Sequence, residues 1–410
     1  MAKKIKSILP DINIIGAGPS GILAAFLLAQ NGFNVTIFDK NSFPRTKACG
    51  GAISMISLNI YKRYMPMFYH EITNSKESIK FDNVKINIKD KTSYTITTKG
   101  TSNNYNENYF GIIVDRKWFD NVALNFAKEN QNIKIELSNK IDVNLIHNKN
   151  PKNNETITII ANGKNYFKNR PCIDTSFLGT QGFFKPKSEW TLKNFELFYL
   201  PEILPGYLWA FKLSDERLNI GAITTPEKFA NLKLSSSDTL LALISKTHIK
   251  NFIDKDCLID KTLTKMLPSY MCENQLQMTE NIFFIGDSAG LINPFSGEGI
   301  SNALTSAVIV AKHIISKHNH QDEKYESLIE SEKNLKKQFI QDNKIRELFS
   351  NIKIIERIFS DAEIDKSKKS FIDGIFTGNR SFKDSSSFCI FRLKLKLFKY
   401  FKINLLKIPF

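Results

Sequence analysis

The sequence of 410 residues contains little cysteine and histidine, and neither residue is spaced as a metal site requires. The five cysteines are odd in number and form no Cys-x-x-Cys pair. They are Cys49, Cys172, Cys257, Cys272 and Cys389. This spacing argues against a disulfide framework and against a zinc or iron–sulfur site. Since the six histidines form no cluster either, we expect no metal, and we expect a reducing, cytoplasmic setting.

Long apolar runs are also missing. No stretch reaches the roughly 18 uninterrupted apolar residues of a membrane-spanning helix, and the N-terminus has no apolar segment followed by a small-residue cleavage site. The sequence therefore predicts a protein that is not integral to a membrane. Zinc-finger and RNP motifs are lacking as well, so we expect no nucleic acid partner despite a net charge of +16.

The positive charge is concentrated only in the last residues, RLKLKLFKYFKINLLKIPF. On a helix, Leu397, Phe398, Phe401 and Leu405 share one side, and most of the lysines lie opposite. Such a tail is typical of a cationic helix on a membrane surface, here the inner face. A helix packed on the body of the protein has the same pattern, so both interpretations stay open.

The order of apolar runs and glycine turns predicts an α/β fold. Residues 12–15 form a short apolar run, GAGPSG follows, ILAAFLLAQNG has helical spacing, and VTIFD is a second strand. This is the opening unit of a doubly wound parallel sheet. Between residues 79 and 109 apolar and polar residues alternate instead, which predicts antiparallel strands.

We therefore predict three parts. A discontinuous, Rossmann-like nucleotide-binding domain comprises residues 1–78, 108–178 and 275–317. An inserted, antiparallel β-rich substrate domain comprises residues 79–107 and 179–274. A helical region follows at 318–410, in which the segment DSSS at 384–387 is the expected flexible joint before the basic tail.

The first glycine turn has the fingerprint of a dinucleotide site. Gly16 makes the tight turn, Gly18 lets the backbone approach a pyrophosphate, and Gly21 allows the helix to pack closely on the strand. The helix N-terminus then faces the phosphates, and Asp39 is placed to bind a ribose, but this pattern does not separate NAD from FAD. The candidate residues of this unit are Gly16, Gly18, Pro19, Ser20, Gly21, Asp39 and Lys40.

A second strand, turn and helix, IFFIGDSAGLINPFSGEGISNALTSA, has different chemistry. Asp287 ends the strand, where its carboxylate suits the hydroxyls of a ribityl chain. Gly297 and Gly299 flank Glu298 at the start of a helix, whose N-terminus would stabilise negative charge on a reduced flavin. The candidate residues here are Gly286, Asp287, Pro294, Gly297, Glu298, Gly299 and Ile300.

Together with FPRTKACGG at residues 43–51 and DRKWFD at 115–120, these motifs resemble the geranylgeranyl reductase family within the FAD-dependent hydroxylase-fold enzymes. The resemblance extends from the first strand to the helix near Lys317. It implies FAD as cofactor and Arg116 as the residue that braces it. Gly290 stands where aromatic hydroxylases of this fold usually have the histidine of G-D-A-A-H. Flavin halogenases generally carry a lysine in a glycine-glutamate-serine context, whereas the cysteine followed by glycines found here is what the prenyl reductases show.

Two segments depart from the pattern of the family. PGYLWAFKL at 205–213 resembles the substrate-domain signature, in which an aromatic pair, here Tyr207 and Trp209, lines the cavity, but Lys212 stands where a proline is usual. Packed strand aromatics are the alternative interpretation of this pair. Many members also carry an A-D-G-x-x-S segment, in which Asn162 replaces the aspartate and Tyr166 the serine. The lost negative charge concerns NAD(P)H use and the redox partner more than FAD binding.

The resemblance implies that the FPRTKACGG loop folds over the flavin, with Gly50 and Gly51 letting the backbone pass close to the ring. Cys49 would face the substrate, either as a proton donor whose pKa Lys47 lowers or as part of the cavity wall, and a buried packing residue is the alternative. Arg45 and Lys47 are either anion contacts at the cofactor or loop cations. The loop thus adds Arg45, Ala48, Cys49 and Gly50 to the cofactor candidates, and the catalytic candidates are Cys49, Gly50, Gly51, Tyr207 and Trp209.

The expected activity is an FAD-dependent reductase that saturates C=C bonds of a polyprenyl, geranylgeranyl-type chain in a lipid, quinone or chlorophyll-type precursor, by hydride transfer from N5 of the reduced flavin. An FAD monooxygenase or halogenase acting on an aromatic or carrier-bound intermediate is the alternative, and a flavin-binding scaffold or sensor is a third. The expected partner is a hydrophobic prenyl substrate. The electron donor stays open among NADPH, NADH and a ferredoxin, and so does the oligomeric state.

Overall fold

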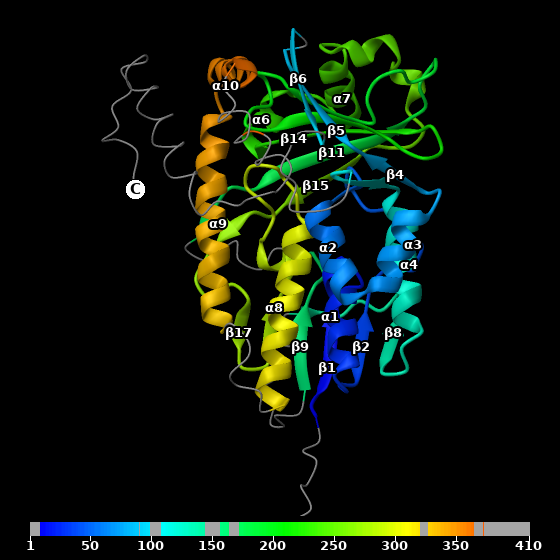
Figure 1. Ribbon diagram of the computed structural model, residues 1–410, viewed down its shortest axis with the longest axis vertical. Helices are drawn as coiled ribbons and strands as arrows, with labels where there is room; N and C mark the ends of the chain where they lie inside the picture. Colours follow the sequence, from blue (N-terminus) through cyan, green and yellow to red (C-terminus); the bar gives the residue numbers. More distant parts are fainter. Residues whose placement is uncertain are drawn as a thin grey trace, which may run out of the picture.

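The computed structural model describes residues 9–89, 91–98, 108–143, 156–163, 172–319, 327–364 and 372. Two bodies are stacked along the long axis of the molecule (Figure 1). The lower body in this view contains the first strand and both glycine turns, and the upper body contains a large sheet.

A six-stranded sheet forms the centre of the lower body, in the order β17-β18-β9-β1-β2-β8. Neighbouring strands are parallel except for β17 and β18. The strands are β1 (Asp11–Ile15), β2 (Val35–Phe38), β8 (Ile133–Glu136), β9 (Thr156–Ile160), β17 (Gln277–Thr279) and β18 (Ile282–Phe284). Short runs of apolar, β-branched residues such as TITII in β9 suit a parallel sheet that is covered on both faces. The predicted doubly wound fold is confirmed.

Two long helices begin at the two glycine turns. α1 (Pro19–Gln30) follows β1, and α8 (Ile300–Asn319) follows β18 and the short helix η3 (Gly286–Ala289). α1 packs on α8 and on α4 (Arg116–Lys128), which explains why α1 is apolar on nearly all sides. The N-termini of α1 and α8 both lie at the carboxyl edge of the sheet, where ligands bind in folds of this kind.

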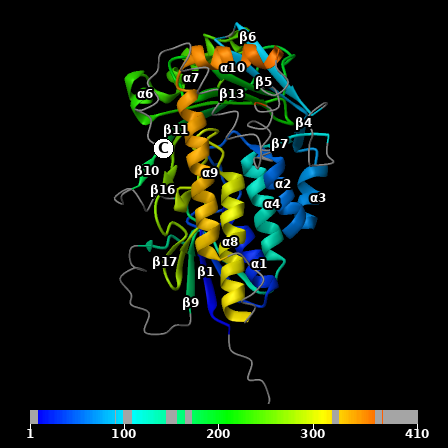
Figure 2. The ribbon, with the colours of Figure 1, turned by 60° about the vertical axis from the view of Figure 1, so that its left-hand side comes forward.

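A three-stranded antiparallel sheet, β3-β7-β4, lies where the two bodies meet, at the level of the labels β4 and β7 in Figure 2. It contains β3 (Ala52–Ser54), β4 (Ser78–Phe81) and β7 (Gly111–Val114), and α2 (Met55–Tyr64) and α3 (Pro66–Asn74) connect β3 to β4. The rings of Tyr61, Phe68 and Phe119 meet edge to face, which fixes these two helices against α4.

The upper body is built on a seven-stranded sheet in the order β15-β11-β14-β13-β12-β5-β6. Its strands are antiparallel except for the pair β12 and β5. They are β5 (Asn83–Ile88), β6 (Thr92–Thr97), β11 (Phe177–Phe184), β12 (Phe195–Tyr199), β13 (Tyr207–Lys212), β14 (Leu218–Thr224) and β15 (Leu263–Leu267). Antiparallel strands were predicted between residues 79 and 109, and β4 to β6 provide them. The domain boundaries themselves stay a prediction.

The two faces of this sheet have different neighbours because side chains alternate along each strand. In β13, Leu208 and Ala210 pack in a core with Leu240 and Leu243 of α7 (Ser236–Ile244). Also on that side are α6 (Pro226–Asn231), η1 (His248–Asn251) and η2 (Lys255–Cys257). Tyr207, Trp209 and Phe211 have the opposite orientation, toward the cavity between the bodies.

Two further helices complete the described chain, and α9 (Leu328–Leu348) runs along both bodies. It lies beside α8, and α10 (Ile352–Ile364) crosses over the upper sheet (Figure 2). Phe349, just after α9, contacts the rings of Phe295 and Tyr199. Within the described ranges, no helix combines the length and apolar character needed to cross a membrane. The DSSS segment and the basic tail lie outside the described residues, so the predictions about them stay predictions.

The expectation of no disulfide was wrong, because Cys172 and Cys272 are bonded, with their Cα atoms 4.7 Å apart. The two cysteines flank a short antiparallel pair of strands, β10 (Ile173–Asp174) and β16 (Tyr270–Met271), in which Ile173 lies opposite Met271. The register of these two strands brings together two cysteines that are 100 positions apart in the sequence. Cysteine spacing in the sequence does not reveal such a pairing. The inference of a reducing setting therefore loses its basis.

Candidate functional site

The first glycine turn, between β1 and α1, is shaped by contacts within the protein. A Cβ atom at Gly16 would lie 2.4 Å from the carbonyl oxygen of Ala161, and one at Gly21 would lie 2.0 Å from the carbonyl oxygen of Gly16. Gly18 differs, since no atom of the described residues lies within 4 Å of its Cβ position. It is the N-cap of α1, and with Pro19 and Ser20 it lines the cavity. The space beside Gly18 therefore gives an anion access to the helix N-terminus.

Asp39 supports this turn from the end of β2. Its two carboxylate oxygens accept the backbone N–H groups of Ala17 and Asn41, each at 2.9 Å. A carboxylate has further lone pairs, so Asp39 is fixed in place and can still accept hydrogen bonds from a ribose. Lys40, the next candidate, is exposed.

The second glycine turn meets the first. A Cβ atom at Gly286, whose φ is +62°, would lie 3.1 Å from both Ser20 Oγ and Ala303 Cβ. The following residue, Asp287, lines the cavity, and no hydrogen bond or ion pair to its carboxylate is found within the described residues. Gly290 has a φ of +68°, and a Cβ there would lie 2.4 Å from Tyr270 Cδ2. Packing of Tyr270 thus explains why no larger residue occupies the position that is histidine in aromatic hydroxylases.

The loop before α8 is held from several sides. Asn293 Oδ1 accepts the N–H groups of Phe295 and Ser296, and Asn293 Nδ2 donates to buried Asp342 of α9 at 2.8 Å. Ser54 of β3 donates to Glu298 at 2.6 Å. Gly297, Glu298, Gly299 and Ile300 line the cavity, whereas Pro294 is buried outside its wall.

The two glycines after Cys49 are required by the protein itself. A Cβ atom at Gly50 would lie 2.7 Å from the Phe211 ring, and one at Gly51, whose φ is +83°, would lie 2.1 Å from the carbonyl oxygen of Val114. Both residues line the cavity with Ala48 and Cys49. Phe211 and Val114 therefore exclude a side chain at Gly50 and Gly51, whatever else is bound. The predicted contact of these glycines with a flavin ring stays a prediction.

A chain of hydrogen bonds connects this loop to the seven-stranded sheet of the upper body. Trp209 Nε1 donates to Asn219 Oδ1 at 3.1 Å, and Asn219 Nδ2 donates to the Cys49 carbonyl oxygen at 2.9 Å. Cys49 Sγ accepts the Gly51 N–H at 3.4 Å. Tyr207 donates its hydroxyl to the Ser296 carbonyl oxygen at 2.6 Å, and burial, with smaller contributions from Glu298 and Cys49, raises its pKa. The two aromatics predicted from the signature therefore line the cavity and also position the flanking loops.

The predicted arginines have different surroundings. Burial by itself would lower the pKa of Arg116, but Asp120, bound at 2.7 Å, and the Cys49 thiol raise it overall. Arg116 lines the cavity, whereas Arg45 is outside the cavity wall and forms an ion pair with Asp120 at 3.4 Å. Of the two open interpretations, Arg45 has the surroundings of a loop cation.

Lys47 does line the cavity. Burial lowers its pKa from 10.5 to about 8, a change that Asp287 opposes and that Arg116 and Lys265 reinforce. Lys265 of β15 lines the same cavity. The sequence analysis did not select Lys265, and no motif near it marks the position.

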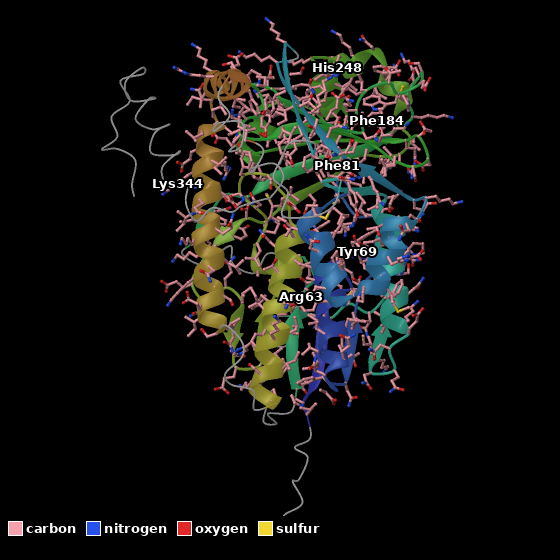
Figure 3. The ribbon with its side chains drawn as sticks, viewed as in Figure 1. Arg63, Tyr69, Phe81, Phe184, His248 and Lys344 are labelled. Carbon is pink, nitrogen blue, oxygen red and sulfur yellow. A yellow bond between two sulfur atoms is a disulfide. The ribbon has the colours of Figure 1, made fainter. Side chains whose placement is uncertain are left out.

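The cavity encloses about 670 Å³ between the two bodies. The charged residues that line it are Lys47, Arg116, Lys265, Asp287 and Glu298. The upper wall is apolar, with Phe81, Phe195, Leu197, Tyr199, Trp209 and Phe211 among its residues. Figure 3 shows Phe81 at the boundary of the two bodies, below Phe184 of the upper sheet.

α9 also contributes to the wall, which the sequence analysis missed. Ser331, Asn334, Leu335 and Gln338 face the cavity at helical spacing. The spacing alone indicates only an amphipathic helix, and its partner is decided by the tertiary structure.

The two departures from the family pattern affect different places. Asn162 accepts a hydrogen bond from Ser288 at 3.3 Å, so it still connects β9 to the second glycine turn. Tyr166 lies outside the described residues. Lys212 pairs with Glu216 at 2.8 Å and is not part of the cavity wall. The Lys212 N–H also donates to the Asn194 carbonyl oxygen at 3.0 Å, a bond that a proline would remove.

These residues fit FAD. The open position at Gly18 and the α1 N-terminus suit a pyrophosphate, and Asp39 suits the adenosine ribose. Asp287 and the α8 N-terminus suit the ribityl chain and the ring of the flavin. Lysines in the same cavity match the negative charge of such a ligand.

Comparison with known proteins gives the same picture. Residues 14–54 match the model of an NAD(P)-binding Rossmann-like domain. The chain is 26% identical over 334 residues to an uncharacterized protein of Methanosarcina barkeri, covering 75% of this chain and 74% of that one. It is 23% identical over 436 aligned positions to digeranylgeranylglycerophospholipid reductase 3 of Methanosphaera stadtmanae, covering 96% and 98%.

Solved structures share the fold. A geranylgeranyl bacteriochlorophyll reductase-like protein from Thermoplasma acidophilum has a TM-score of 0.65 at 15% identity, over 86% of this chain and 91% of that one. The flavin-dependent brominase Bmp2 has a TM-score of 0.69 at 15% identity, over 96% and 99%. The predicted resemblance to geranylgeranyl reductase-like FAD oxidoreductases is confirmed, and the comparisons support an FAD-binding oxidoreductase of this type.

Proposed function

We propose that this FAD-dependent oxidoreductase reduces C=C bonds of a polyprenyl chain in a lipid, quinone or chlorophyll-type precursor. The observation that carries the proposal is the distribution of charge in the cavity. Four of its five charged lining residues belong to the lower body, with Lys265 of β15 as the exception, whereas the upper sheet lines it mainly with aromatic and aliphatic side chains. Burying an isoprene unit of five carbons against such a wall contributes about 4 kcal/mol, at about 0.8 kcal/mol per carbon.

When bound, FAD supplies the hydride, which adds to one carbon of the double bond while a proton adds to the other. An isolated alkene is poorly activated, so the protein must position it and exclude water. Trp209 and Phe211 provide a rigid wall for this purpose, because Asn219 holds the Trp209 ring and Gly50 packs against Phe211. Tyr207 holds the loop before α8 through the Ser296 carbonyl.

For the proton, Cys49 is our candidate donor. It lies in the cavity wall on the loop that Asn219 fixes, and its sulfur accepts the Gly51 N–H. These contacts hold the thiol in one place, as proton transfer to a positioned carbon requires.

An anaerobic single-turnover experiment tests the proposal. The FAD protein is photoreduced and mixed with geranylgeranyl lipids, and flavin reoxidation is followed together with product mass. We expect reoxidation and a gain of two hydrogens per bond. Cys49→Ala should slow the step, whereas Cys257→Ala, the matched change at a buried cysteine outside the cavity, should not. A flavin that stays reduced with every prenyl lipid would contradict the proposal.

The monooxygenase or halogenase alternative is favoured by one observation, the likeness of the whole fold to a flavin-dependent brominase. It predicts that the reduced flavin is reoxidised only when oxygen is admitted and that an aromatic or carrier-bound substrate is then modified. Oxygen dependence therefore separates the two functions. The predicted donors, NADPH, NADH or a ferredoxin, and the contact of the tail with a membrane surface stay proposals.

A further inference from the structure

Two lysines reach the charged end of the cavity from opposite sides. Lys47 belongs to the loop after β2 in the lower body, and Lys265 belongs to β15 at the edge of the upper sheet. Along β15, Lys265 and Leu267 line the cavity, whereas Thr264 and Met266 are exposed. The alternation of the strand thus directs this lysine inward.

Lys265 lies beside the second glycine turn. Its Nζ atom is 3.5 Å from the position that a Cβ would occupy at Gly163, and Asp287 Oδ2 is 3.8 Å from the same position. The ammonium group and the carboxylate therefore border one small space next to Gly163. They do not touch, since no ion pair within 4.0 Å joins them.

Within the described ranges, neither lysine has a partner of its own. In the part of the chain that the structure describes, the amino groups of Lys47 and Lys265 make no hydrogen bond and no ion pair. Arg116 in the same wall is different, because Asp120 binds it through several hydrogen bonds. Two half-buried cations that share one nearby carboxylate leave an excess of positive charge, which an anionic ligand would neutralise.

We propose that Lys47 and Lys265 form an anion site shared between the two bodies, which binds an anionic group of the cofactor. This inference rests on the FAD binding that the proposed function requires, but not on the prenyl substrate. The anion is either a phosphate of the dinucleotide or the negative charge of the reduced flavin ring. Because β15 belongs to the substrate-domain sheet, binding at Lys265 ties that sheet to the glycine turns, and FAD acts as a clamp between the two bodies.

The test measures binding without turnover, so that it is independent of any prenyl reduction. Oxidised FAD and riboflavin are titrated into the cofactor-free protein, and sulfite is titrated into the FAD protein, since the sulfite adduct places negative charge on the ring. The variants are Lys265→Met and Lys265→Arg, and Lys261→Met is the matched control because Lys261 is an exposed lysine four residues earlier.

If the site binds a phosphate, Lys265→Met weakens FAD binding about 10- to 100-fold, as expected for a lost charge-assisted bond, and leaves riboflavin unchanged. If the site binds the reduced ring, FAD binds normally and sulfite binds about 10- to 100-fold more weakly. Lys265→Arg retains most of either affinity, and Lys47→Met repeats the effect from the other body.

The proposal would be overturned if Lys265→Met bound both FAD and sulfite as tightly as wild type does. It would also be overturned if Lys261→Met lost as much affinity as Lys265→Met. Far-ultraviolet circular dichroism and urea unfolding of the cofactor-free variants verify the fold. If Lys265→Met does not fold, Lys265→Gln and Lys47→Met provide the same comparison.

Discussion

Replacing Lys47 with methionine is expected to stabilise the cofactor-free protein. Lys47 lines the cavity without an ion pair in the described part of the chain. Methionine retains most of the length of the side chain and removes its charge, so the substitution tests the charge more than the packing.

The magnitude follows from the pKa. Burial lowers the pKa of Lys47 from 10.5 in a solvated chain to about 8 in the folded protein. Between pH 8 and 10.5 the unfolded chain therefore binds more protons than the folded one, so the free energy of unfolding rises with pH across this window. The rise corresponds to up to about 3 kcal/mol, at about 1.4 kcal/mol per pKa unit, and below pH 8 the folded protein bears this full penalty.

The assay is urea unfolding of the cofactor-free protein between pH 6 and 11, followed by tryptophan fluorescence. At pH 7 the Lys47→Met variant should be more stable than wild type by up to about 3 kcal/mol, and the difference should disappear above pH 10.5. Lys40→Met, at an exposed lysine after the same strand, is the control and should show no such difference. A Lys47→Met variant that is less stable than wild type at pH 7, or that retains the full pH dependence of wild type, would refute the reasoning.

Three further predictions concern the first glycine turn, the disulfide bond and the hydrogen bonds of Asn219. Gly18→Val should leave the fold intact, because the Cβ position is open, and should abolish FAD binding in a fluorescence titration. Gly21→Ala should unfold the protein, because a Cβ there lies 2.0 Å from the Gly16 carbonyl oxygen. Equal behaviour of the two variants would contradict this prediction. Reduction of the disulfide bond between Cys172 and Cys272, which closes a loop of 100 residues, should lower the free energy of unfolding by about 4 to 5 kcal/mol. Rapid alkylation of both cysteines in the untreated protein would show that the bond does not exist. Asn219→Leu leaves the Trp209 indole and the Cys49 carbonyl without their hydrogen-bond partner. We expect the free energy of unfolding to fall by about 2 to 4 kcal/mol and anaerobic flavin reoxidation by prenyl lipids to become slower. An unchanged unfolding midpoint would show that these hydrogen bonds do not stabilise the protein.

Local motifs were enough to predict the turns that bind the cofactor. Gly16, Gly18 and Gly21 follow a strand and open a helix, and each contact that excludes a side chain involves residues of the same unit or its neighbouring strand. Asp287 and the glycines before α8 were found in the same way. Such motifs are readable because strand, turn and helix are fixed within a few tens of residues.

The reasons behind other positions were not readable. Gly50 and Gly51 were assigned to a flavin contact, but the Phe211 ring and the Val114 carbonyl exclude a side chain there. Both partners are distant in the sequence, and only the folded arrangement brings them together. The bond between Cys172 and Cys272 was missed for the same reason, because the pairing of β10 with β16 sets it.

The sequence by itself determined the α/β class, the two glycine turns and the resemblance to FAD-dependent reductases, because these depend on short-range spacing and chain periodicity. The tertiary structure alone decided which walls enclose the cavity. Lys265 of β15 and Gln338 of α9 line the cavity together with residues of the first glycine turn. Arg45 forms an ion pair with Asp120, whereas Lys47 of the same loop lines the cavity. A side chain acquires such neighbours only when distant segments pack, since burial and charge at a site are properties of the whole fold.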